Sequence, residues 1–282
     1  LGARSEAEVA ILLDWNCWWA LELDSKPSAD VRLLDGLRIF YAPLYEANVP
    51  VDFAHPGADL SPYKLVVVPN LYLVTDDSAE NIRHFVADGG TLLMSFFSGI
   101  ADANDHIRLG GYPAPFKDLL GLVIEDFFPM ATGETNVLDT RKGESFQSDL
   151  WADLIHLKDA ESLAWYAEGF YAGTPAVTRN AFGDGAAYYL GTRPEGRYVE
   201  MLVQTVCERA GVDPTIQAPP GIDAVRRKTE DASFLFLLNH NDKAVEVRLP
   251  VPGLDLLTEK EHDSMLMLDS LEVAVLREAP RG

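Results

Sequence analysis

Runs of apolar residues without alternation mark the first hundred positions of the chain. Three of them predict strands that are buried on both faces, because a strand with one wet face would alternate polar and apolar residues. Between them, apolar residues spaced three and four apart predict helices, and Gly89-Gly90 ends the second helix. A short strand completes a β-α-β-β-α-β pattern typical of a parallel sheet covered by helices. In chain order these elements are residues 9–13, 28–45, 49–53, 65–69, 75–88 and 91–97.

The pattern changes after this first part. Residues 98–115 are loop-like, residues 123–163 form short mixed segments, and Asp184-Gly185 predicts a hairpin. A helix is expected over 198–210. The proline-containing stretch 213–220 predicts a linker, and short alternating strands follow it. The expected domains are 6–212, the linker 213–220, and 221–282. The expected fold is an α/β three-layer domain with a mostly parallel sheet, flavodoxin-like and similar to class I glutamine amidotransferases, followed by a small antiparallel β-domain.

Composition narrows the possible partners and compartment. The 282 residues are 48% hydrophobic and 24% charged, as in soluble globular proteins. The net charge of −21 disfavours binding to nucleic acid or to an anionic membrane, and no run approaches the roughly 20 apolar residues of a membrane helix. Only two cysteines are present, which favours a reducing, cytoplasmic location. The start of the chain has neither a signal-like apolar core nor an initiator Met. We therefore expect either a processed terminus or a piece of a longer polypeptide.

Three of the five tryptophans follow the first buried strand within five positions. Tryptophans clustered past a strand end are typical of an interface or of a sugar-stacking platform, and burial in the core is the alternative. The loop after the third parallel strand should open on the same edge of the sheet. The candidate interface or cleft-wall residues from the two loops are Trp15, Trp18, Trp19, Ser98, Arg108 and Tyr112.

The sequence lacks the residue patterns typical of a nucleophile, a metal site or a dinucleotide site. Cys17 lacks the glycine-flanked turn that presents a nucleophile, and no histidine is followed two positions later by Glu, as the amidotransferase triad requires. The histidines do not fall at metal-ligand spacings, and Gly183-Asp184-Gly185 precedes a strand, which disfavours a dinucleotide site. We expect no catalytic residue, no metal ligand and no cofactor.

A resemblance adds to this interpretation. Residues 14–22, Asp-Trp-Asn-Cys-Trp-Trp-Ala-Leu-Glu, resemble a stretch in the middle domain of family 42 β-galactosidases. The likeness continues in the same order over nearly the whole chain, at residues 51–52, 60–69, 89–92, 98–100, 109–113, 171–180, 189–194 and 236–240.

The resemblance implies a trimerisation domain and a C-terminal β-domain of a glycosidase. In this family a (β/α)8 barrel that precedes them carries both glutamates of a retaining mechanism, and neither glutamate maps onto a residue here. The parent would hydrolyse terminal β-D-galactosides, whereas this chain alone is expected to be inactive. Its expected partners are the barrel of its own polypeptide and the neighbouring subunits of a homotrimer. The alternatives are a Cys17-dependent amidotransferase-like enzyme and a sugar-binding module that uses Trp15, Trp18 and Trp19.

Overall fold

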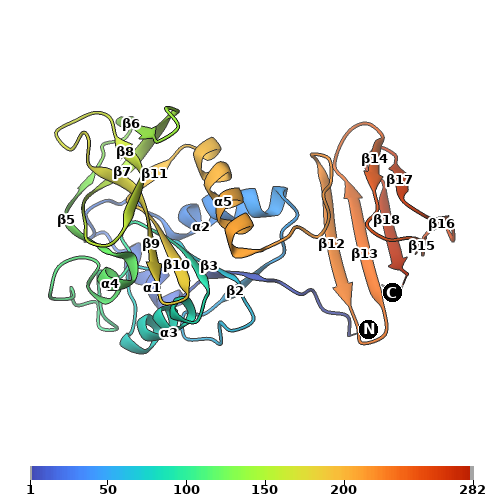
Figure 1. Ribbon diagram of the computed structural model, residues 1–282, viewed down its shortest axis with the longest axis horizontal. Helices are drawn as coiled ribbons and strands as arrows, with labels where there is room; N and C mark the ends of the chain where they lie inside the picture. Colours follow the sequence, from blue (N-terminus) through green and yellow to red (C-terminus); the bar gives the residue numbers. More distant parts are fainter. Residues whose placement is uncertain (1, 280–282) are drawn as a thin grey trace. The chain divides into compact units, whose positions relative to one another are not determined.

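The computed structural model describes residues 2–279 (Figure 1). The chain divides into two compact units. The larger unit comprises Val9–Tyr41 and Asp52–Gly211, and the smaller comprises the residues up to Glu8, Ala42–Val51 and the residues from Val212 onward.

The larger unit is built around one sheet, with eleven strands among the described residues. Its order is β11-β7-β6-β8-β9-β10-β4-β3-β1-β2, and β5 pairs with β7. The strands are β1 (Val9–Leu12), β2 (Val51–Ala54), β3 (Leu65–Val68), β4 (Thr91–Ser95), β5 (Leu122–Pro129), β6 (Thr135–Thr140), β7 (Ser145–Leu157), β8 (Glu161–Tyr166), β9 (Pro175–Phe182), β10 (Gly185–Leu190) and β11 (Thr192–Pro194). The helices are α1 (Trp15–Leu21), α2 (Leu33–Glu46), α3 (Asp76–Ala87), a 3-10 turn at Ala114–Phe116, α4 (Lys117–Leu120) and α5 (Gly196–Ala210).

The prediction of a mostly parallel sheet, as in flavodoxin and class I glutamine amidotransferases, is wrong. Parallel pairing joins β1 to β3, β3 to β4 and β4 to β10. Antiparallel pairing joins β10 to β9, β9 to β8, β8 to β6, β6 to β7, and β7 to both β5 and β11. The error lies in residues 122–166. Buried polar side chains such as Ser148 and Asp153 occupy inward positions there, so the strands lack a clean apolar alternation.

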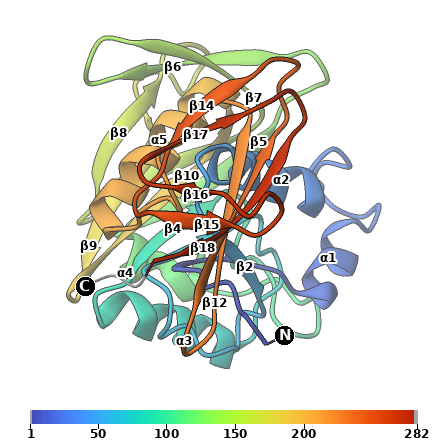
Figure 2. The ribbon, with the colours of Figure 1, turned by 90° about the vertical axis from the view of Figure 1, so that its right-hand side faces the viewer.

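Helices cover both faces of the parallel strands. One face carries Leu12, Val68 and Met94 and packs against apolar residues of α1, α3 and α4. Figures 1 and 2 show α2 and α5 together on the opposite face. Burial on both faces explains why β1, β3 and β4 read as uninterrupted apolar runs.

Helix boundaries follow local capping chemistry. Thr75 caps α3, because its Oγ1 accepts a hydrogen bond from the Ser78 backbone N–H at 3.1 Å. The helix expected from residue 28 begins only at Leu33, since the Ser28 hydroxyl accepts the Asp30 N–H at 3.2 Å and closes a local turn instead.

The smaller unit contains a five-stranded sheet of order β12-β13-β18-β15-β16 and a two-stranded sheet, β14-β17. Antiparallel pairing joins β12 to β13, β13 to β18, β18 to β15, β15 to β16, and β14 to β17. Leu235 and Leu237 of the five-stranded sheet belong to one apolar cluster with Val247 and Leu266 of the two-stranded sheet. The strands are β12 (Ile222–Lys228), β13 (Ser233–Asn239), β14 (Val245–Arg248), β15 (Gly253–Asp255), β16 (Glu261–His262), β17 (Met265–Leu268) and β18 (Val273–Glu278).

Candidate interface at the carboxyl edge of the parallel strands

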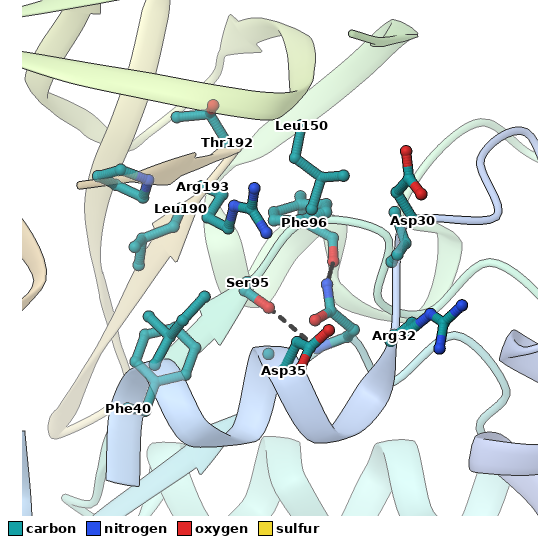
Figure 3. A pocket seen from close by; sticks show the side chains of 15 residues that line it. Asp30, Arg32, Asp35, Phe40, Ser95, Phe96, Leu150, Leu190, Thr192 and Arg193 are labelled. Carbon is teal, nitrogen blue, oxygen red and sulfur yellow. Dashed lines mark hydrogen bonds between the residues drawn. The ribbon is translucent and has the colours of Figure 1, made fainter. Parts of the chain in front are cut away.

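The loops that leave β3 and β4 are held together by a buried polar clamp. The Ser95 hydroxyl accepts the Asn70 N–H at 2.9 Å, and the Asn70 amide donates to the Phe96 carbonyl at 2.9 Å (Figure 3). Both Asn70 and Phe97 have positive φ, at 42° and 57°. Non-glycine residues in this region are costly and cluster at functional sites, so this edge of the sheet is the place to look for function.

The first candidate loop forms the short helix α1. Asp14 caps it by accepting the Asn16 N–H at 2.9 Å. Trp18 is half-buried, stacks on Trp15 with 5.2 Å between ring centroids, and donates its indole N–H to Glu22 at 2.8 Å. Trp15 is 57% exposed and Trp19 is 66% exposed. Two indoles of one helix therefore present apolar surface to solvent.

Ser98, at the start of the second candidate loop, is fully buried. Its hydroxyl donates to the Ser95 carbonyl at 2.8 Å and accepts the Leu71 N–H at 3.0 Å. Ser98 therefore holds the ends of β3 and β4 together and contributes no surface of its own.

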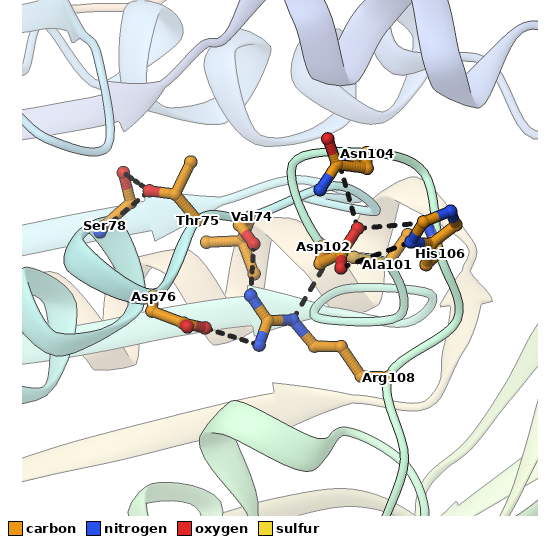
Figure 4. Close-up of polar contacts among 9 residues, drawn as sticks. All are labelled: Val74, Thr75, Asp76, Ser78, Ala101, Asp102, Asn104, His106 and Arg108. Atoms are coloured by element: carbon orange, nitrogen blue, oxygen red, sulfur yellow. Dashed lines mark hydrogen bonds and ion pairs between the residues drawn. The ribbon is translucent and has the colours of Figure 1, made fainter.

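Arg108 folds back against the protein (Figure 4). Its Nη1 lies 2.7 Å from the Asp76 carboxylate, and its Nη2 donates to the Val74 carbonyl at 2.5 Å. The neighbouring Asp102 accepts the backbone N–H groups of Asn104 and His106, and these hydrogen bonds, led by Asn104, lower the pKa of Asp102. These polar contacts fix the loop, and Arg108 positions it through its contacts with Asp76 and Val74.

Tyr112 is half-buried against Phe127, with 5.5 Å between ring centroids. The loop that contains Arg108 and Tyr112 also exposes two apolar side chains that were not among the candidates predicted from the sequence. Ile107 is 52% exposed and Leu109 is 94% exposed. Apolar residues within a polar, glycine-containing loop were the signal that could have identified them.

A second missed feature ties the loops after β1, β3 and β4 to one another. The Lys26 ammonium donates to the Tyr72 hydroxyl at 2.7 Å and lies 3.1 Å from the Asp105 carboxylate. Burial, followed by the hydrogen bond to Asp105, raises the pKa of Tyr72. The Lys26 side chain is only 7% exposed and that of Asp105 is 33% exposed, so water and salt screen this pair less than a fully exposed ion pair.

Cys17 does not have the setting of a nucleophile. Its side chain is fully buried, and its Sγ lies 3.6 Å from the Asn70 carbonyl. Burial raises the pKa of Cys17 to about 12, so the thiol stays protonated at neutral pH. The Cys17-dependent amidotransferase alternative therefore lacks its thiolate.

The next candidates are a metal site and the cavity beside α2. Residues 2–279 contain no group of three or more His, Cys, Asp or Glu side chains arranged to hold a metal ion. A cavity of ≈20 Å³ lies between α2 and the strand ends, lined by residues that include Asp35, Phe40, Leu190 and Arg193 (Figure 3). A space of that volume is large enough for a water molecule, not for a sugar. Within the described chain, no helix is long and apolar enough to cross a membrane.

Comparison with protein families identifies the class of protein. Residues 7–213 match the family described as the β-galactosidase trimerisation domain, and residues 221–278 match the β-galactosidase C-terminal domain. The chain belongs to the family of β-galactosidases that contain these two domains.

Two curated relatives share extensive sequence identity with the chain. The chain is 41% identical over 281 residues to the β-galactosidase BgaB of Geobacillus sp. (strain Y412MC61), covering 99% of this chain and 42% of the relative. It is 43% identical over 242 residues to the β-galactosidase LacZ of Heyndrickxia coagulans, covering 86% and 36%. The chain thus spans less than half the length of these curated relatives.

Solved structures share the fold. The crystal structure of a β-galactosidase from Bacillus circulans sp. alkalophilus superposes with a TM-score of 0.95 at 36% identity, covering 99% of this chain and 42% of that one. A family GH42 β-galactosidase, Gan42B, gives 0.92 at 33% identity, covering 97% and 40%. The mixed sheet is therefore the fold of this family, which replaces the flavodoxin-like prediction.

Proposed function

We propose that this chain is the non-catalytic assembly region of a family 42 β-galactosidase that hydrolyses terminal β-D-galactosides. The relatives are named β-galactosidases, and the chain covers 42% of the length of BgaB. In this proposal both catalytic glutamates belong to a barrel domain that precedes residue 6. The trimerisation domain is residues 6–212, the linker 213–220, and the C-terminal β-domain 221–282. The two cysteines, both free and buried, support a reducing, cytoplasmic location.

The observation that carries the proposal is the pair of exposed indoles on α1. With Trp15 57% and Trp19 66% exposed, burial against a partner would remove about 250 Å² of largely apolar surface from water. That corresponds to roughly 6 kcal/mol of gross hydrophobic stabilisation. Aromatic side chains on a rigid element are typical of interface hot spots. We assign this face to docking on the barrel of the same polypeptide or of a neighbouring subunit in a homotrimer. Ser98, Arg108 and Tyr112 position the adjoining loop.

The experiment is a mutational test of assembly in the longer polypeptide. The double variant Trp15→Ala/Trp19→Ala should shift sedimentation from trimer towards monomer and reduce galactoside hydrolysis. The matched control is Phe170→Ala, which removes a ring that is 75% exposed in the loop between β8 and β9 and should leave assembly intact. Unchanged sedimentation together with unchanged galactoside hydrolysis of the double variant would contradict the assignment.

The sugar-binding alternative rests on the same indoles, and it is separated by titration. The isolated chain should show no saturable change in tryptophan fluorescence with millimolar galactose or lactose. A saturable change that disappears in Trp15→Ala/Trp19→Ala would favour the sugar-binding module.

A further inference from the structure

The five-stranded sheet of the smaller unit has apolar side chains on both faces. Its inner face includes Leu235, Leu237 and Leu276, which are 0–1% exposed and belong to the apolar cluster with β14 and β17. The residues between them point the other way, because side chains alternate along a strand. The apolar side chains of this outer face are Val225, Phe234, Phe236, Leu238, Val273 and Val275.

Strand register places the outer side chains in continuous rows. Phe236 lies between Val225 on β12 and Val275 on β18. Leu238 is paired with Val273, which is 41% exposed. Val225, Phe236 and Val275 are only half-buried, unlike the inner face. A sheet that is apolar on both faces is typical of one covered on both.

Two arginines flank one end of this outer face. Phe234 lies between Arg227 on β12 and Arg277 on β18, and both arginines are exposed. The chain as a whole carries a net charge of −21, so two exposed arginines beside an apolar row are distinctive. It favours a partner surface with apolar side chains and carboxylates.

The N-terminal segment runs beside the same end. Arg4 and Lys228 form an antiparallel bridge through two backbone hydrogen bonds of 2.9 and 2.8 Å. The Arg227 guanidinium donates to the Ala3 carbonyl at 2.9 Å, and Lys228 pairs with Glu6 at 2.6 Å. Polypeptide that precedes these residues would emerge next to the outer face. A short tether gives its domain a high effective concentration there.

We propose that the outer face of the five-stranded sheet is the docking surface for the domain that precedes this chain in the parent polypeptide. The proposal rests on the proposed function, which supplies that domain, and adds a second contact independent of the α1 tryptophans. The docking domain presents apolar side chains to the rows around Phe236 and a carboxylate to Arg277.

Cysteine labelling measures whether the face is covered. The native thiols give little background, because burial raises the pKa of Cys17 to about 12 and that of Cys207 to about 11. Val275→Cys places a thiol on the outer face. Met267→Cys is the matched control, since Met267 is 55% exposed on β17. Val225→Cys repeats the measurement on β12 in case the first variant folds poorly.

Each variant is labelled with a maleimide in this chain alone and in the longer polypeptide. We expect Val275→Cys to react at least about tenfold more slowly in the longer polypeptide, the signature of a thiol released only by local opening. Met267→Cys should react equally in both. Adding Arg277→Glu should restore part of the reactivity at position 275, whereas Arg248→Glu on β14 should not.

Equal reactivity of Val275→Cys in both proteins would overturn the proposal. Protection in the isolated chain that rises with its concentration would assign the face to a second copy and also overturn it. Labelling reports this face directly, whereas sedimentation of Trp15→Ala/Trp19→Ala reports the other surface, so the two proposals fail separately.

Discussion

Asp153 is a buried carboxyl group in the middle of β7. It is 2% exposed. Its Oδ1 accepts the Trp151 indole N–H at 2.8 Å, and its Oδ2 accepts the Tyr189 hydroxyl at 2.7 Å. Its backbone N–H donates to the Tyr166 hydroxyl at 3.2 Å. Among the described residues no cationic side chain forms an ion pair with it, so burial dominates and raises the pKa of Asp153 to about 7.

The sign of the effect on stability follows from the two pKa values. The unfolded chain releases this proton near the ordinary aspartate pKa of 3.8, whereas the folded chain holds it to a pKa of about 7. Between these values the folded state binds more protons, so stability falls as pH rises. The shift corresponds to about 4 kcal/mol, and the loss is complete above the folded pKa. For a domain of this size that is roughly 8–16 °C in Tm.

The assay compares the wild-type chain with Asp153→Asn, which cannot ionise, by urea unfolding at intervals between pH 4 and pH 8. The difference in unfolding free energy should move by about 4 kcal/mol in favour of the variant as pH rises. Asp159→Asn, which alters an exposed carboxylate in the turn after β7, should show no comparable drift. A constant difference between wild type and Asp153→Asn across this range would refute the reasoning.

Three further predictions test the burial of a thiol, the packing at a glycine and an ion pair. The Cys17 thiol should resist iodoacetamide at pH 8 in the native chain and react after denaturation, and reaction of the native thiol would contradict its assigned burial. Gly36→Ala should lower the unfolding free energy by about 1–3 kcal/mol, because a Cβ would lie 2.1 Å from Asn70 Oδ1; unchanged urea unfolding would contradict this packing. Arg226→Met should cost about 3–5 kcal/mol in the smaller unit, because Glu278, 3% exposed, would lose a charge partner at 2.8 Å; unfolding as in wild type would show that the pair is not needed.

The sequence could predict elements whose burial is uniform. β1, β3 and β4 are buried on both faces, so their uninterrupted apolar runs predict them from the sequence alone. The antiparallel half of the sheet was not predictable in the same way. Its strands do not form uniform apolar runs, and β7 carries the buried Asp153, whose hydrogen bonds to Trp151 and Tyr189 exist only after folding.

The candidate interface was only partly predictable for a related reason. A tryptophan cluster after a buried strand placed the indoles at the sheet edge, but sequence does not separate exposed Trp15 and Trp19 from half-buried Trp18. That depends on the stacking within α1 and on the hydrogen bond to Glu22. Ser98 was selected by position alone, whereas its hydroxyl faces inward to the β3 and β4 ends.

The most direct measurement of the central claim is hydrolysis of a chromogenic β-galactoside by the purified chain, alongside the longer polypeptide at equal molar concentration. We propose that both catalytic glutamates lie outside this chain. We therefore expect this chain to release the chromophore at the rate of the buffer blank, and the longer protein to turn the substrate over. Turnover that copurifies with this chain through successive columns would contradict the claim that it is an assembly region.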